Sequence, residues 1–242
     1  MRILKTFLTT LLLATGAAQA QPAAAPATLV VVHGIPGRDV AAALDPRLPV
    51  DVQVNGSICL AQGLTFGTIS GPYTVPAGTY QVAVSLANTV APCSNTPVIN
   101  ANVKVAAGKE YAVVAALDPT GAPTAYPFAL DFSIVGQGQG RVIVAHAADA
   151  PAVNVDGVQQ PSHGGAGAKF RVSNLNPGQI QSADFLPPGT YQVKVSPVGS
   201  KTPVVGPVAL SVPNNGLDLI FAVGNASSGS ITVLTAAIPN VF

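Results

Sequence analysis

Three histidines are the residues of this chain best suited to acid–base chemistry or metal binding. His33 and His146 each end an apolar run, Leu29-Val-Val-Val-His33 and Val142-Ile-Val-Ala-His146, which is typical of a strand. They hold equivalent places in a repeat and should lie far apart unless the repeats pack together, and His163 lies in a glycine-rich stretch. A metal centre needs several ligands around one ion. We therefore expect no metal site, and expect His33 and His146 to order adjacent loops through hydrogen bonds.

The segment Val30-Val-Val-His33-Gly34-Ile-Pro-Gly37 is the strongest hint of hydrolytic chemistry. A strand followed by a His-Gly loop can supply oxyanion-hole amides, but the α/β-hydrolase fold also requires a Gly-x-Ser-x-Gly elbow before a helix. The sequence has no such pentapeptide, and Gly224-Asn-Ala-Ser-Ser-Gly229 has different spacing. Calcium loops, dinucleotide loops and phosphate loops are absent as well. We therefore predict a protein that is not an enzyme, with no catalytic residue and no cofactor.

Cys59 and Cys93 are the two cysteines of the chain. In an exported protein an even count indicates a disulfide, and two cysteines allow one intramolecular pairing. A redox-active pair is the alternative, but Cys-x-x-Cys spacing is missing. We predict a structural Cys59–Cys93 disulfide that staples one part of the chain.

The N-terminus predicts export. Arg2 and Lys5 precede a short apolar run, and Ala18-Gln-Ala20 follows it, which is the pattern of a cleaved signal peptide. The run is shorter than the roughly 20 residues that span a bilayer, and no second long apolar run follows. We therefore expect residues 1–20 to be a signal peptide, residues 21–27 a Pro/Ala spacer, and the mature chain to be periplasmic or extracellular without a transmembrane span.

Charge limits the partners of the mature chain. Charged residues make up 9% of the sequence and hydrophobic residues 48%. A chain so sparsely charged offers no basic stripe for nucleic acid, and its apolar content argues against disorder. The partner is unknown, and another envelope protein or a glycan remains an option.

A tandem repeat organises the sequence. Pro-Ala-Gly-Thr-Tyr-Gln-Val-Ala-Val-Ser at 76–85 recurs as Pro-Pro-Gly-Thr-Tyr-Gln-Val-Lys-Val-Ser at 187–196. Apolar residues alternate in both copies, which indicates half-buried strands of an antiparallel sheet. Val50-Asp-Val-Gln-Val54 alternates too and runs into Asn55-Gly56, a favoured hairpin turn. Its predicted counterpart is Val153-Asn-Val155 followed by a turn at Asp156-Gly157.

These elements predict two domains, at residues 28–137 and 138–242, joined by the glycine-rich segment 135–141. The changing spacing between repeats places extra loop residues around 38–48 in the first domain and around 159–168 in the second. Short strands punctuated by 24 glycines and 22 prolines favour an all-β fold. We predict two tandem immunoglobulin-like antiparallel β-sandwiches, with a partly open barrel as the alternative.

Arg141-Val-Ile-Val-Ala-His-Ala-Ala-Asp-Ala-Pro-Ala-Val-Asn-Val-Asp-Gly157 resembles the opening of the DUF4397 domain, and Leu186-Pro-Pro-Gly-Thr-Tyr191 resembles its next landmark. The match after His33 is weaker, because the hairpin there is displaced. Two copies would cover nearly all of the mature chain. The resemblance implies a secreted or cell-surface β-domain without an assigned activity. It also implies structural roles for its motif positions, which are His33, His146, Asp149, Pro151, Gly78, Tyr80, Gly189 and Tyr191.

The leading hypothesis is a non-enzymatic surface, adhesion or matrix module that presents variable loops on a duplicated scaffold. The alternative is a module that binds a carbohydrate or another small ligand. Exposed aromatic residues on one sheet face would favour the alternative, but the chain has five Tyr and eight Phe, and several occupy core-like positions.

Overall fold

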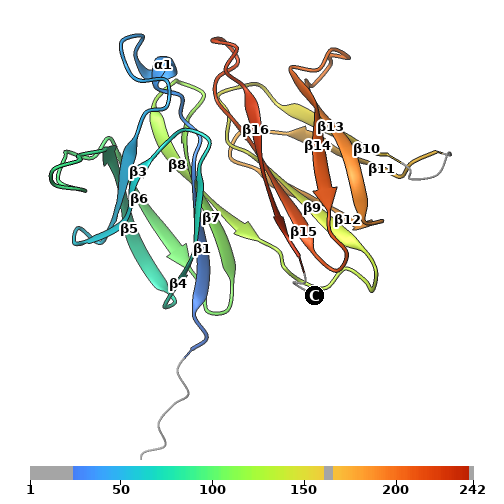
Figure 1. Cartoon of the computed structure of the whole chain (residues 1–242), viewed down its shortest axis with the longest axis horizontal. Helices are drawn as coiled ribbons and strands as arrows, with labels where there is room; N and C mark the ends of the chain where they lie inside the picture. The colour runs from blue at the N-terminus through green and yellow to red at the C-terminus, as the bar shows by residue number, and fades with distance from the viewer. Residues whose placement is uncertain (1–23, 161–165, 240–242) are drawn as a thin grey trace, which may run out of the picture.

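A computed structural model describes residues 24–160 and 166–239, so the predicted signal peptide and His163 lie outside the described residues. The described chain is almost entirely β-structure, in two halves of eight strands each (Figure 1). The first half contains β1 (Ala27–His33), β2 (Val50–Val54), β3 (Ile58–Leu64), β4 (Ile69–Val75), β5 (Gly78–Leu86), β6 (Ile99–Val105), β7 (Glu110–Leu117) and β8 (Pro123–Leu130). The second contains β9 (Gly140–His146), β10 (Val153–Gln159), β11 (Lys169–Leu175), β12 (Ile180–Leu186), β13 (Gly189–Pro197), β14 (Val205–Val212), β15 (Leu217–Val223) and β16 (Thr232–Ile238). The one helix of the described residues, α1 (Gly37–Val40), is too short to span a membrane.

Each half is a sandwich of two four-stranded sheets. The first half has the orders β4-β1-β7-β8 and β3-β2-β5-β6, and the second has β12-β9-β15-β16 and β11-β10-β13-β14. The two strand orders of the second half become those of the first half when eight is subtracted from each strand number. The predicted all-β sandwich architecture is therefore confirmed.

The connectivity adds two features that the sequence did not predict. The pairs β1–β7 and β9–β15 are parallel, whereas the other pairings are antiparallel. The first two strands of each half also lie in opposite sheets, whereas the immunoglobulin order keeps its first two strands in one sheet. The likeness to immunoglobulin domains is thus one of architecture.

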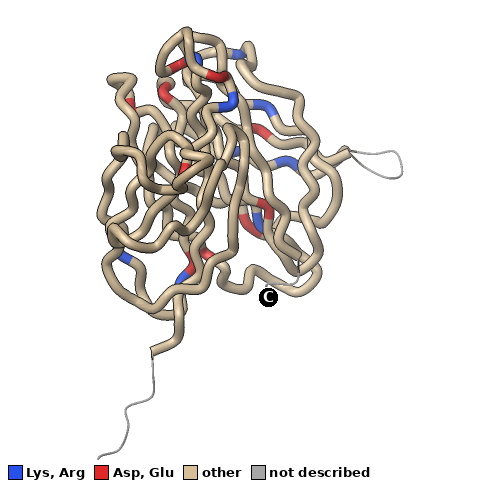
Figure 2. The backbone as a smooth tube through the Cα atoms, turned by 60° about the vertical axis from the view of Figure 1, so that its left-hand side comes forward, with Lys and Arg blue, Asp and Glu red and all other residues tan. Residues whose placement is uncertain are grey.

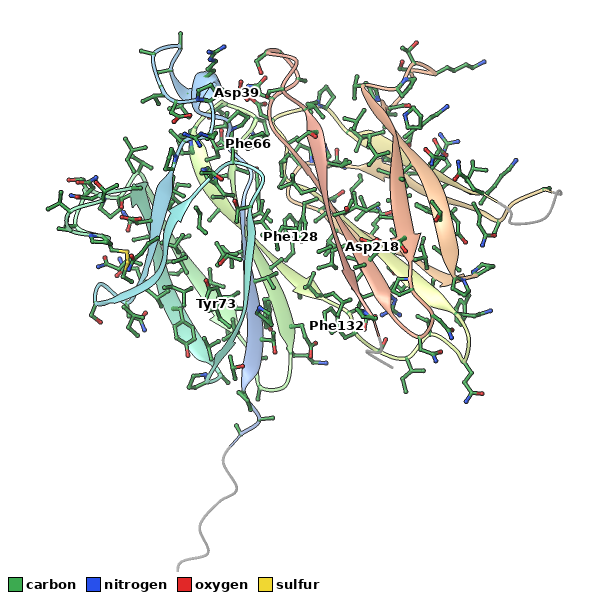
Figure 3. The ribbon with its side chains drawn as sticks, in the orientation of Figure 1. Asp39, Phe66, Tyr73, Phe128, Phe132 and Asp218 are labelled. Carbon is green, nitrogen blue, oxygen red and sulfur yellow. A yellow bond between two sulfur atoms is a disulfide. The ribbon has the colours of Figure 1, made fainter. Side chains whose placement is uncertain are left out.

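A shared apolar layer joins the two halves. Each sandwich has its own core between its sheets, and a third cluster combines residues of β7 and β8 with residues of β9 and β15. Val114 and Phe128 belong to this layer from the first half, and Leu219 and Phe221 from the second. Figure 3 shows Phe128 between the two halves. The molecule is therefore a stack of four sheets (Figure 1).

The central strands β7 and β15 of the two inner sheets are buried on both faces. In β7, Val113 faces the first core whereas Val114 faces the shared layer. In β15, Ile220 faces the second core whereas Phe221 faces the shared layer. These strands differ from the half-buried strands predicted around Tyr80 and Tyr191, because packing between the halves covers their second face. A continuous apolar run is the pattern of such two-sided burial.

One predicted turn is confirmed and the other is corrected. Asn55 and Gly56 both have positive φ, 52° and 67°, as a tight hairpin turn requires. At Asp156-Gly157, however, β10 continues to Gln159. The strand continues because Gly157 pairs with Phe170 of β11 and with Val193 of β13. A Cβ on Gly157 would clash with the Phe170 ring. Gly157 serves close packing within the strand and not a turn.

Candidate functional site

Loops of both halves meet at one end of the stack, which we call the loop end. It consists of residues 34–49, 118–122, 147–152 and 224–231. In Figure 1, α1 and the β15–β16 connection lie at the top of the molecule. The halves touch here, because a Cβ on Gly34 would lie 2.7 Å from Val223. Asp39 of the first half also accepts a hydrogen bond from the Ser230 hydroxyl of the second.

His33 holds the longest loop of this end in place. Its Nε2 lies 2.7 Å from the carbonyl oxygen of Leu48, and its Nδ1 accepts from the backbone N–H of Ile35 at 3.4 Å. A carbonyl only accepts, so Nε2 carries the ring proton and the imidazole is neutral. Burial lowers the pKa of His33, against the opposing effect of the Leu48 hydrogen bond. Both ring nitrogens thus serve to hold the loop.

His146 repeats this arrangement in the second half. Its Nε2 lies 3.1 Å from the carbonyl oxygen of Pro151, and its Nδ1 accepts from the backbone N–H of Ala148 at 3.2 Å. Burial lowers its pKa as well, and the Pro151 hydrogen bond opposes the shift. The two histidines therefore occupy equivalent strand ends with equivalent partners.

This equivalence predicts matched effects of mutation. Replacing His33 or His146 by Ala should lower the free energy of unfolding by about 1 kcal/mol, and by up to about 3 if the carbonyl left behind stays buried without a partner. Neither change should remove a catalytic activity. Denaturant unfolding and turnover of a generic ester would be measured for both variants and the parent. Ester turnover by the parent that is lost only in His33→Ala would contradict this interpretation.

An open depression of about 370 Å³ lies at the loop end between the halves, lined by Pro119 and by residues of the second half that include Asp149, Asn225 and Ser227. Asp149 accepts from the side-chain amide of Asn225 at 2.8 Å. Asn225 in turn accepts from the backbone and hydroxyl of Ser227, at 2.7 and 2.6 Å. These bonds fix the shape of the depression.

The tyrosines of the repeated motif lie at the opposite end. The Tyr80 hydroxyl donates to the carbonyl of Pro76 and the Tyr191 hydroxyl to that of Pro187, both at 2.8 Å. Each bond ties a strand to the turn that precedes it. The glycines of the motif, Gly78 and Gly189, begin β5 and β13, and Gly189 has a φ of 141°.

The predicted Cys59–Cys93 disulfide is present, with Cα atoms 5.8 Å apart. Asp51 anchors the segment that it closes, by accepting from the backbone N–H of Cys93 at 2.8 Å, of Gly63 at 2.9 Å and of Asn88 at 3.0 Å. Burial raises the pKa of Asp51, but these three hydrogen bonds outweigh it, so that the pKa lies below its usual value. The disulfide is part of a structural network.

Other candidate chemistry is limited. Within residues 24–160 and 166–239, no three His, Cys, Asp or Glu side chains are placed to hold a metal ion. Charged residues are sparse, and several lie at the loop end (Figure 2). Only the structure identified Arg141, a buried side chain whose Nε lies 2.7 Å from Asp184 and which also pairs with Asp131, the residue after β8. Its signal in the sequence, a lone arginine beside an apolar strand, is weak.

Comparison with known proteins gives one family. The model of the family described as "Domain of unknown function (DUF4397)" matches residues 27–156. No curated protein matches the chain. Among solved structures, the chain is similar to a protein from Bacteroides ovatus described as a "putative adhesin", at 10% identity over 82% of this chain and 88% of that one. The TM-score is 0.23, too low to inform the fold or the function of this chain.

Proposed function

Because the chain belongs to the DUF4397 family, whose description assigns no function, we propose its role from its own surface. We propose an exported, non-enzymatic module of the cell surface or matrix that binds another envelope protein through the loop end. The N-terminal sequence and the disulfide support export, since disulfides persist in oxidising compartments. Identifying the first residue of the mature protein, which is expected to be Gln21, tests the proposed export.

The observation that carries the proposal is the gathering of loops from both halves on one rigid support. Loops on a rigid scaffold are the usual carriers of recognition. The loop between β1 and β2 spans residues 34–49, whereas the equivalent loop between β9 and β10 spans only residues 147–152. The shared apolar layer and the Asp39–Ser230 contact hold the two sets of loops together. The additional residues of the β1–β2 loop thus enlarge the recognition surface at the loop end, where the scaffold tolerates an insertion.

A matched pair of charge reversals tests the proposal. Beads coated with the purified protein would be incubated with cells of the producing organism, and bead retention would be counted. Arg38→Glu, an exposed change in α1, should reduce retention about tenfold, because a rim charge affects association. Lys109→Glu, which is also an exposed change but lies at the opposite end, should leave retention unchanged. Equal retention by Arg38→Glu and the parent, or equal losses in both variants, would contradict the proposal.

A second candidate function is carbohydrate binding at the loop-end depression. Asp149, Asn225 and Ser227 offer carboxylate, amide and hydroxyl groups of the kind that bind sugar hydroxyls. A glycan array with the parent and Asn225→Ala would test it, and binding equal in both would exclude this site.

A further inference from the structure

The first half contains an apolar cavity at the end opposite the loop end. The cavity has a volume of about 440 Å³ and lies where β1 begins, next to the β2–β3 and β4–β5 turns. Its lining residues are Leu29, Val54, Ile58, Leu60, Thr74, Val75, Pro76, Tyr80, Val82, Val103 and Val105. Small-molecule sites in proteins commonly measure about 300–1,000 Å³. The space is large enough for a small ligand.

The chemistry of the lining selects an uncharged apolar occupant. Its inner wall is formed by buried aliphatic residues, Leu29, Val82 and Val103 among them, and no lining residue carries a charge. At the rim, Ile58 is 55% exposed, and the Tyr80 hydroxyl already donates to Pro76. A charged ligand would lose its hydration here without a compensating partner.

The second half shows what fills the equivalent space. Val54 pairs with Val82 and with Ile58, whereas in the second half Gly157 pairs with Val193 and with Phe170. Val82 follows Tyr80 by two residues, just as Val193 follows Tyr191, and the two tyrosines hold the same place in the repeated motif. Gly157 therefore corresponds to Val54, and Phe170 corresponds to Ile58.

Phe170 closes the second half from within. Its side chain is 7% exposed, and its ring centroid lies 5.8 Å from that of Tyr191, which is fully buried. The missing Cβ of Gly157 makes room for the ring. In the first half, Val54 carries the side chain that Gly157 lacks, and the smaller Ile58 points partly into solvent. The same fold is therefore plugged in one half and open in the other.

We propose that this cavity binds a small, neutral, hydrophobic molecule whose ring or chain takes the place that the Phe170 ring fills in the second half. The ligand would bury its apolar surface against the inner wall, which is the main source of affinity in such a site. An unfilled space of this kind forfeits dispersion contacts with its lining, so a ligand would also stabilise the first half. This site lies apart from the loop end and goes beyond the function proposed there.

The test is a fluorescence titration with N-phenyl-1-naphthylamine, a neutral aromatic probe that brightens in apolar surroundings. The parent should bind one probe per chain saturably. The double variant V54G/I58F, which copies the second half, should bind at least tenfold more weakly, with circular dichroism as the folding control. No saturable binding by the parent, or equal binding by a folded V54G/I58F, would overturn the proposal.

A second variant tests the same proposal in the other half. Phe170→Ala removes the plug and should raise the stoichiometry from one probe to two. If the folded Phe170→Ala variant still binds one probe per chain, the proposal is overturned. This holds whether or not V54G/I58F folds or binds the probe. The bead assay with Arg38→Glu runs on a different surface, so its outcome is independent of this one.

Discussion

Replacing Phe221 by Ala is expected to lower the free energy of unfolding of the whole chain by about 3–5 kcal/mol, the usual cost of deleting a buried aromatic side chain. Phe221 is 1% exposed and belongs to the apolar layer shared by the two halves. Chemical denaturation at neutral pH, followed by circular dichroism, would measure the change.

The same substitution in residues 138–242 expressed alone is the control. In that fragment the face of β15 that carries Phe221 would meet water, so Phe221→Ala should cost far less there. The fragment keeps its own core and is expected to fold, as the repeat predicts, but to self-associate through the uncovered face. Equal costs in fragment and full chain would mean that Phe221 stabilises the second half alone and that the shared layer contributes little.

Asp218 is the second position with a large expected effect. Its side chain is 2% exposed on the face of β15 that carries Ile220, and its Oδ1 has no hydrogen-bonding partner. Burial raises the pKa of Asp218 to about 7 from a usual value of 3.8. Figure 3 shows Asp218 within the second half. The folded protein therefore holds a neutral carboxyl group at mildly acidic pH.

The direction of the pH effect follows from proton binding. Below about pH 4 the carboxyl is protonated in both states, and Asp218 has no effect on stability through ionisation. Between about pH 4 and pH 7 only the unfolded chain loses the proton, so the free energy of unfolding falls as pH rises. Above pH 7 this decrease in the free energy of unfolding is complete. A pKa shift of this size corresponds to roughly 4 kcal/mol.

Asp218→Asn should therefore gain stability relative to the parent, by a difference that grows between pH 5 and pH 8. Denaturant unfolding at both pH values would measure it, and any cost of burying the new amide is the same at both. Asp51→Asn is the contrasting control, because the pKa of Asp51 is lowered and its carboxylate stabilises the fold at neutral pH. A difference between Asp218→Asn and the parent that does not change with pH would contradict the raised pKa.

The sequence determined those features that depend on neighbouring residues. Alternation around Tyr80 and Tyr191 predicted strands, and Asn55-Gly56 predicted a turn, because side-chain direction and positive φ are local properties. The histidines could be assigned to strand ends because the repeat gave them equivalent neighbours. Their partners, Leu48 and Pro151, required the fold.

Only the tertiary structure decided the features that depend on what lies across a sheet. Asp156-Gly157 has the residues of a turn, yet β10 continues through it, paired with β11 and β13. The Phe170 ring occupies the space that a side chain at position 157 would need. Ile58 and Phe170 hold equivalent positions, yet Ile58 is exposed and Phe170 is buried. The cavity beside Ile58 exists only once both sheets of the first half are packed. The shared layer likewise needs both halves, because burial of a second strand face is a property of the neighbour that covers it.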